Sequence, residues 1–119
     1  MMRPSAMLDT VYLCVEHVDF RKSINGLSAI VEENMELDPF QPALFVFINR
    51  GKDKLKILYW EKSGFCLWYK RLEKERFQWP KDSAEATITL NGEALNWLLD
   101  GFDIWRNKPH QTLHYPSAL

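Results

Sequence analysis

Cysteine is scarce in this chain, with two residues among 119, Cys14 and Cys66. Each stands inside an apolar run, and the two do not form the close pair that marks a zinc-binding or redox motif. Thiols placed in this way do not indicate the disulfide framework that holds small secreted domains together. We expect both to be reduced and packed as small apolar side chains in a reducing compartment.

Long apolar segments are also missing. The longest uninterrupted one covers residues 43–48, whereas a helix needs about 20 apolar residues to span a bilayer. Residues 1–15 lack the extended apolar stretch and the cleavage pattern of a signal peptide. We therefore expect a soluble, cytoplasmic protein with no membrane partner.

Catalytic motifs are absent as well. The five glycines form no phosphate-binding loop, and neither a nucleophile elbow nor a metalloprotease helix occurs. His110 and His114 have a spacing that suits zinc on a helix, but Pro109 and Pro116 bracket them and leave little more than one turn. Histidines in water or at a contact are therefore favoured over a zinc site. We predict no catalytic residues, no metal, no cofactor and no enzymatic activity.

Charge is nearly balanced overall but unevenly distributed. The net charge is −1, which argues against a protein that coats DNA. Residues 50–76, however, hold nine Lys or Arg against four Asp or Glu, while the remainder holds six against twelve. One region of the protein can therefore attract phosphate while the rest repels it.

Apolar spacing and turn residues predict a single α+β domain over residues 1–104, built as an antiparallel β-meander with two helices. Asp19 is the expected N-cap of a helix that runs to residue 37, and Asn91 that of a helix that runs to residue 100. Strands are expected at 11–15, 44–48, 54–60, 65–72, 77–79 and 86–90. The segment 105–119 has two prolines and little periodicity, which predicts an extended or loosely packed tail.

The stretch FCLWYKRLEKERFQWP, residues 65–80, combines five aromatic with four basic residues. A symmetric hairpin loop at 61–64 would place Lys54 opposite Arg71 and Lys56 opposite Tyr69 on one face of the sheet. If the chain then returned as a third strand, Arg76 and Gln78 would join that face, and Trp68, Phe77 and Trp79 would point into the core. The predicted basic patch therefore consists of Lys54, Lys56, Tyr69, Arg71, Arg76 and Gln78.

Two interpretations of this patch remain open. A like-charge pair such as Lys54 with Arg71 costs up to about 1 kcal/mol, which a bound anion would remove. Alternatively, Asp53 and Glu73 shield the pair, and the patch is merely solvated. A register shift of one residue would move these side chains to opposite faces and dissolve the patch.

Three segments resemble the accessory protein of IS66 insertion sequences, the TnpB or Orf2-like family, which is distinct from the RNA-guided nuclease of the same name. They are VDFRKSINGL (18–27), LFVFINRGKDKLKILYWEKSGFCLWYKRLEKERFQWP (44–80) and LNWLLDGFDI (95–104). The resemblance adds Arg21, Lys22 and Arg50, which belong to the shared motif, to the candidate DNA- or partner-binding residues. Glu75 departs from the family, in which many members have glycine, and would be strained if that turn needed a positive φ.

The resemblance implies a role in DNA transposition beside a large transposase that performs the strand chemistry. It carries over no catalytic residues. The leading hypothesis is a non-enzymatic accessory factor that contacts DNA, the transposase of the same element, or both, through the basic and aromatic sheet face. The rival is a pure protein-interaction module that docks the transposase without touching DNA, because interfaces also favour aromatics and Arg. A small nuclease is a third hypothesis. Neither the residues nor the resemblance indicates an oligomeric state.

Overall fold

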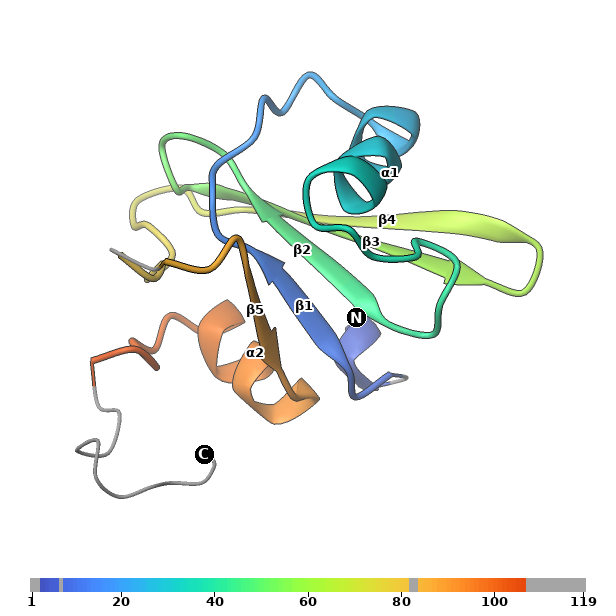
Figure 1. Ribbon diagram of the computed structural model, residues 1–119. Helices are drawn as coiled ribbons and strands as arrows, with labels where there is room; N and C mark the ends of the chain where they lie inside the picture. Colours follow the sequence, from blue (N-terminus) through green and yellow to red (C-terminus); the bar gives the residue numbers. More distant parts are fainter. Residues whose placement is uncertain (1–2, 7, 82–83, 107–119) are drawn as a thin grey trace.

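The computed structural model describes residues 3–6, 8–81 and 84–106, and within them the chain forms one five-stranded sheet with a helix on each face (Figure 1). The strands follow the order β4-β3-β2-β1-β5 across the sheet. In chain order the elements are a short 3-10 helix η1 (Pro4–Ala6), β1 (Val11–Cys14), α1 (Ile24–Glu33), β2 (Leu44–Ile48), β3 (Lys54–Glu61), β4 (Gly64–Arg71), β5 (Thr87–Leu90) and α2 (Gly92–Leu99).

The predicted α+β class with two helices is confirmed, and the meander holds for β2, β3 and β4, which pair antiparallel. The sheet as a whole is mixed, because β1 runs parallel to β2. The reason lies in the connection between them. A chain that leaves β1, forms α1 and returns to the same sheet makes a crossover, and a crossover joins parallel strands.

The expected third strand at 77–79 does not form. The chain leaves β4 at one edge of the sheet and must reach β5 at the other edge, so this segment crosses the sheet and does not pair with β4. On the way, the Phe77 amide donates to the carbonyl of Lys52 at 2.8 Å, and Trp79 Nε1 donates to the carbonyl of Val15 at 2.9 Å. Both side chains are buried as predicted, although they reach the core from a crossing segment.

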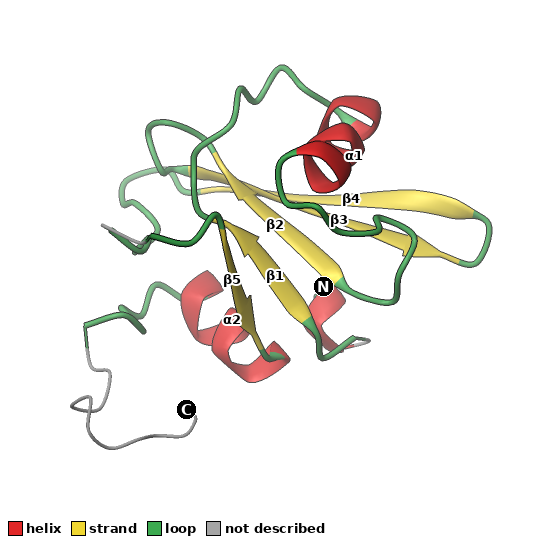
Figure 2. Ribbon diagram, viewed as in Figure 1, coloured by secondary structure: helices red, strands yellow, loops and turns green. Residues whose placement is uncertain are grey.

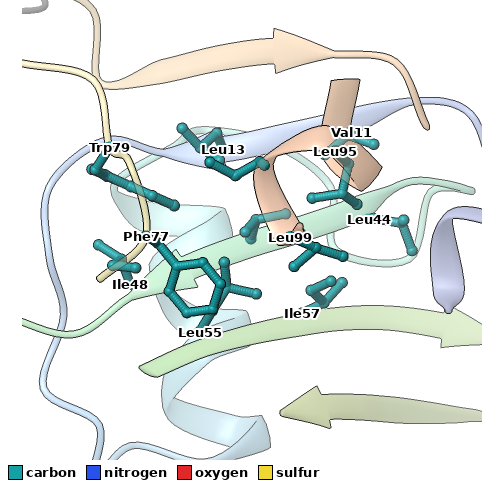
Figure 3. Packing of buried hydrophobic residues seen from close by; sticks show 12 residues of the cluster. Val11, Leu13, Leu44, Ile48, Leu55, Ile57, Phe77, Trp79, Leu95 and Leu99 are labelled. Atoms are coloured by element: carbon teal, nitrogen blue, oxygen red, sulfur yellow. The ribbon is translucent and has the colours of Figure 1, made fainter. Parts of the chain in front are cut away.

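Two apolar cores lie on opposite sides of the sheet. The α2-side core joins alternate residues of β1, β2 and β3 to α2 and to Phe77 and Trp79 (Figure 3). The α1-side core joins the other set of alternate residues, such as Phe45, Phe47 and Leu58, to Leu27 and Val31 of α1. Figure 2 shows the two helices on opposite faces of the strands. We call these faces the α1 face and the α2 face.

The first helix begins later than predicted, because Asp19 does not cap it. The Asp19 carboxylate accepts the Arg21 amide at 2.9 Å, and the Lys22 amide bonds the Asp19 carbonyl at 3.0 Å, which closes a turn before the helix. Ser23 is the N-cap, without a side-chain bond to the helix. At the other end, Glu36 has a φ of 57°, and the Leu37 amide bonds the carbonyl of Val31. A left-handed residue therefore ends the helix before the prolines do.

The second helix matches its prediction. The side chain of Asn91 accepts the Ala94 amide at 2.8 Å, and Gly101 follows the helix with a φ of 97°. Asp9 adds a bond to the Gly92 amide. Arg3 bonds Asn96 and forms an ion pair with Asp100 at 2.7 Å. The N-terminal segment therefore holds α2 through contacts near both ends of the helix.

The register of the β3–β4 hairpin is the predicted one, with Lys54 opposite Arg71 and Lys56 opposite Tyr69. In its turn Lys62 has a positive φ of 55°, and Gly64 is the first residue of β4. Glu75 is not among the positive-φ residues, so the expectation of strain at that position is wrong.

No helix in the described ranges is long and apolar enough to cross a membrane. Of the predicted tail, residues 107–119 lie outside the described part of the chain, and the predicted histidine pair lies there too. Within the described part, Trp105 Nε1 donates to the carbonyl of Gln78 at 2.9 Å, and the indole packs against the α2-side core.

Candidate functional site

Two segments of the chain bring positive charge together at one end of the sheet. The β2–β3 loop bonds to the chain after β4, because the Leu72 amide donates to the Asp53 carbonyl and the Phe77 amide to the Lys52 carbonyl, both at 2.8 Å. Figure 1 shows the two connections side by side. We call residues 49–54 together with 71–76 the loop end of the sheet. It contains six basic residues, Arg50, Lys52, Lys54, Arg71, Lys74 and Arg76, and three acidic ones, Asp53, Glu73 and Glu75.

The β2–β3 loop is held in shape by a side-chain bridge. Asn49 Nδ2 donates to Asp53 Oδ1 at 2.7 Å, and Asn49 Oδ1 accepts the Lys54 amide at 3.0 Å. The pKa of the Asp53 carboxyl lies below its ordinary value, chiefly because of the bond from Asn49, with smaller effects from the charges of Lys54 and Arg76. Asp53 therefore stays ionised and partly offsets the local positive charge.

Lys54, Tyr69 and Arg71 lie on the α1 face near the loop end, as the register predicts. Lys54 Nζ is 3.8 Å from Asp53 Oδ2, and Arg71 Nε is 3.0 Å from Glu73 Oε2. Hydrogen bonding to Glu73 raises the pKa of Arg71 above its ordinary value. Both pairs are solvent-exposed to a third or more, so they contribute little stability. The like charges are thus partly shielded by their sequence neighbours, as one interpretation held.

Lys56 has a structural role that the sequence did not reveal. Its ammonium donates to the carbonyls of Phe20 and Lys22 at 3.1 and 2.9 Å and lies 4.8 Å from the centroid of the Phe20 ring. Burial lowers its pKa below the ordinary value. Lys56 thus fixes the turn that precedes α1, and its donors are already engaged within the protein.

Arg21 and Lys22 lie on that same turn. Arg21 is exposed and forms a two-pronged pair with the Asp19 carboxylate, in which the shortest N–O distance is 2.7 Å. Hydrogen bonding to Arg21 lowers the pKa of Asp19 from 3.8 to about 2. Lys22 is exposed, and the described part of the chain holds no ion pair for it. The turn therefore brings one open cation to the α1 side.

Arg50 and Arg76 are exposed at the loop end, and neither forms an ion pair within the described residues. Arg76 is close enough to Asp53 to affect its pKa, but it does not occupy a third strand of the patch. Gln78 lies on the crossing segment, where its carbonyl accepts from Trp105. The predicted three-stranded patch is therefore a two-stranded one extended by loops. Sequence reasoning missed Lys52 and Lys74, although the charge count over 50–76 contained their signal.

The other end of the same hairpin is aromatic. Phe40, from the loop before β2, contacts Trp60 and Phe65, with ring centroids 5.0 and 5.2 Å away, and these two rings are 5.0 Å from each other. Phe40 is 53% exposed. We call these three residues the aromatic tip. The hairpin register places Trp60 opposite Phe65, but no local spacing could have placed Phe40 beside them.

A cleft of about 690 Å³ lies between α1, the β1–α1 connection and residues 84–86. Its lining includes Cys14, Glu16, Asp19, Lys22 and Glu33. Burial raises the pKa of the Cys14 thiol to about 11, so it is a poor nucleophile at neutral pH. No group of three or more His, Cys, Asp or Glu in the described ranges could hold a metal ion.

Comparison with known proteins gives a family and two relatives. Residues 9–109 match the family described as IS66 Orf2 like protein. Two proteins of Sinorhizobium fredii (strain NBRC 101917 / NGR234) are each 36% identical to the chain, and both carry the description uncharacterized protein. The first, y4hO, aligns over 93% of this chain and 94% of its own length, and the second, y4jC, over 100% and 99%. No solved structure matches the chain significantly.

Proposed function

The chain belongs to the IS66 Orf2-like family, which implies an accessory protein associated with transposition, and from that starting point we propose that it is a non-enzymatic factor that contacts DNA through the loop end. The transposase of the same element would perform the strand chemistry. This chain would supply a basic surface that binds the phosphate backbone with little dependence on sequence.

The convergence of two loops carries this proposal. Six basic and three acidic residues meet at the loop end, while the rest of the chain has an excess of acidic residues. Of the six basic residues, Lys54 and Arg71 have carboxylate partners nearby, whereas Arg50 and Arg76 are exposed without an ion pair in the described ranges. An acidic remainder would confine a polyanion to this end of the molecule.

The test reverses charge at the two open arginines. The double variant Arg50→Glu with Arg76→Glu should fold normally, since neither side chain holds a hydrogen bond or ion pair within the described part of the chain, and should lose DNA retention at low salt together with support of transposition. The matched control is Lys62→Glu. Lys62 is an exposed lysine in the turn between β3 and β4, at the other end of the hairpin from the loop end. Normal retention and transposition by the double variant would refute the proposal.

Lys56→Glu is unsuited to this test, although Lys56 belongs to the predicted patch. Its ammonium bonds two carbonyls of the turn before α1. A carboxylate there would repel those oxygens and disturb the fold, so a loss of activity could not be assigned to lost DNA contact.

The aromatic tip supports a second candidate function, docking of the transposase without DNA contact. Three mutually packed rings with an exposed Phe40 resemble the aromatic anchors of protein interfaces. Glu61 beside the tip makes this end less suited to phosphate. Under this second function, Phe40→Ser would abolish co-purification with the transposase and leave DNA retention unchanged. Under the DNA proposal, the Arg50 and Arg76 reversals would abolish DNA retention and leave co-purification unchanged.

A further inference from the structure

The strand β4 is an open edge of the sheet. It is eight residues long and, within the described residues, pairs with β3 alone, whereas the opposite edge, β5, is four residues long. A long edge strand offers a row of unpaired amides and carbonyls to another strand. Edges are commonly protected by proline, bulges or charged side chains in mid-strand. In β4 the only charges, Lys70 and Arg71, stand at its last two positions, and there is no proline.

The pairing pattern identifies the outward backbone groups. In an antiparallel ladder, alternate residues exchange bonds with the neighbouring strand. The Leu72 amide bonds the Asp53 carbonyl, which continues the ladder of β3 and β4 by one step beyond Lys54 and Arg71. The backbone amides and carbonyls of the even-numbered residues of β4 therefore point toward β3. The outward groups belong to Phe65, Leu67, Tyr69 and Arg71, and within the described ranges they have no hydrogen-bond partner.

Two copies of β4 can pair with each other in antiparallel orientation, with a two-fold axis that passes between their Trp68 residues. In this register the side chains that meet are complementary. Antiparallel pairing of two copies would place Phe65 of one opposite Arg71 of the other, and Leu67 opposite Tyr69. Both pairs lie on the α1 face, and Arg71 would face an aromatic ring, an arrangement that favours a cation. On the α2 face, Cys66 would lie opposite Lys70. No cation would stand opposite another cation, although each strand carries two.

We propose that two copies of this chain pair through β4 and form a continuous ten-stranded sheet. The four outward residues of each copy would all gain backbone partners, because they would form the hydrogen-bonded pairs of the new ladder. The helices permit this arrangement: α1 contacts β3 and β4, and strands are spaced by about 4.8 Å. The two copies of α1 would then lie about 10 Å apart, a normal helix-packing distance.

This inference stands independently of the DNA proposal, because it rests on the sheet edge and not on the loop end. It has a geometric consequence for that proposal. The two Arg71 side chains would project from the same face at opposite ends of the new ladder, separated by six residues or about 20 Å. A dimer would thus present two loop ends on one side of a single sheet.

Light scattering after size-exclusion chromatography, over a range of protein concentrations, tests the dimer. Tyr69→Pro removes an outward amide and no bond to β3, so it should fold but weaken dimerisation at least tenfold. Thr89→Pro is the matched control: the Val15–Ala86 bond makes the Thr89 amide point outward from β5, the other edge. We expect the wild type and Thr89→Pro to have the mass of two chains. A wild type that is monomeric at submillimolar concentration, or a dimer that Tyr69→Pro leaves intact, would overturn the proposal.

The register is tested by cross-linking. In the proposed pairing, Lys70 and the partner's Cys66 form a non-hydrogen-bonded pair, whose Cα atoms lie about 4.5 Å apart and within disulfide range. Lys70→Cys should therefore give a covalent dimer on mild oxidation. Lys62→Cys, at the end of the same hairpin, and the wild type should not. Failure of Lys70→Cys to cross-link, with circular dichroism showing a folded protein, would refute the two-fold axis at Trp68.

Discussion

The two faces of the β3–β4 hairpin are built from alternate residues of the same strands, yet they differ at the loop end. On the α2 face, the segment after β4 crosses the sheet and places Phe77 and Trp79 over Leu55 and its neighbours. On the α1 face, nothing in the described chain covers Tyr69, which is 48% exposed, or the adjacent Lys54 and Arg71. The chain closes one face as core and leaves the other open.

Lys56 and Lys70 look alike in the sequence, but they bond to different segments of the chain. Lys56 points to the α1 face and bonds the carbonyls of Phe20 and Lys22, while Lys70 points to the α2 face and bonds the carbonyl of Leu99 at the end of α2. Each lysine fixes one helix to the hairpin. Of the cations on β3 and β4, those available to a partner are therefore Lys54 and Arg71 at the loop end, because Lys56 and Lys70 are already engaged.

Phe77 and Tyr69 give the strongest contrast in stability between the two faces. Phe77→Ala should lower the free energy of unfolding by about 3–5 kcal/mol, because the ring is 2% exposed and its removal leaves a cavity. Tyr69→Ala, at the same end of the opposite face, should lower it by less than about 1 kcal/mol. Urea unfolding of the two variants measures both. Similar losses would show that the α1 face is as closed as the α2 face.

The two lysines give the next contrast. Lys56→Met should cost about 1–3 kcal/mol because it removes charged donors from two carbonyls. Lys70→Met should cost about 1 kcal/mol, since one carbonyl at the end of a helix loses its partner. Chemical unfolding ranks them, and a smaller loss at Lys56 than at Lys70 would contradict the anchoring role of Lys56.

Glu36, the left-handed residue after α1, should give a smaller change in the free energy of unfolding. Glu36→Gly should raise the free energy of unfolding by up to about 1 kcal/mol, because glycine adopts a φ of 57° without strain. Glu75→Gly is the matched comparison, and it should be neutral or destabilising since Glu75 lacks a positive φ. Stabilisation by Glu75→Gly without stabilisation by Glu36→Gly would reverse this assignment.

The smallest effect is a pH dependence at the turn before α1. The folded pKa of Asp19 is lowered from 3.8 to about 2 by Arg21, so its contribution is complete above pH 4 and is lost as pH falls toward 2. The stability of the wild type should therefore decline more steeply over this window than that of Arg21→Ala. NMR titration of Asp19 checks the cause directly: an unshifted carboxyl in the wild type would remove the premise.

Local features of the structure were predictable from sequence, and long-range ones were not. The hairpin register followed from a short turn and alternation, and α2 from Asn91 and Gly101, because these signals act between near neighbours. The predicted start of α1 was wrong, because the Asp19 carboxylate accepts bonds from Arg21 and does not cap the helix. The role of Lys56 depends on the turn at residues 19–22, and the position of Phe40 depends on a loop that reaches the hairpin. The path of the crossing segment after β4 depends on the order of the strands in the sheet, which the amino-acid composition does not encode.

The salt dependence of DNA affinity shows whether the loop end binds phosphates. If Arg50 and Arg76 contact phosphates, the logarithm of the association constant should fall linearly with the logarithm of salt concentration, and each substitution by Gln should reduce the slope by about 0.9. Lys62→Gln, at the other end of the hairpin, should leave the slope unchanged. We expect two separate reductions of the slope, which add in the double variant. An unchanged slope in that variant, or no salt-sensitive binding by the wild type, would contradict it.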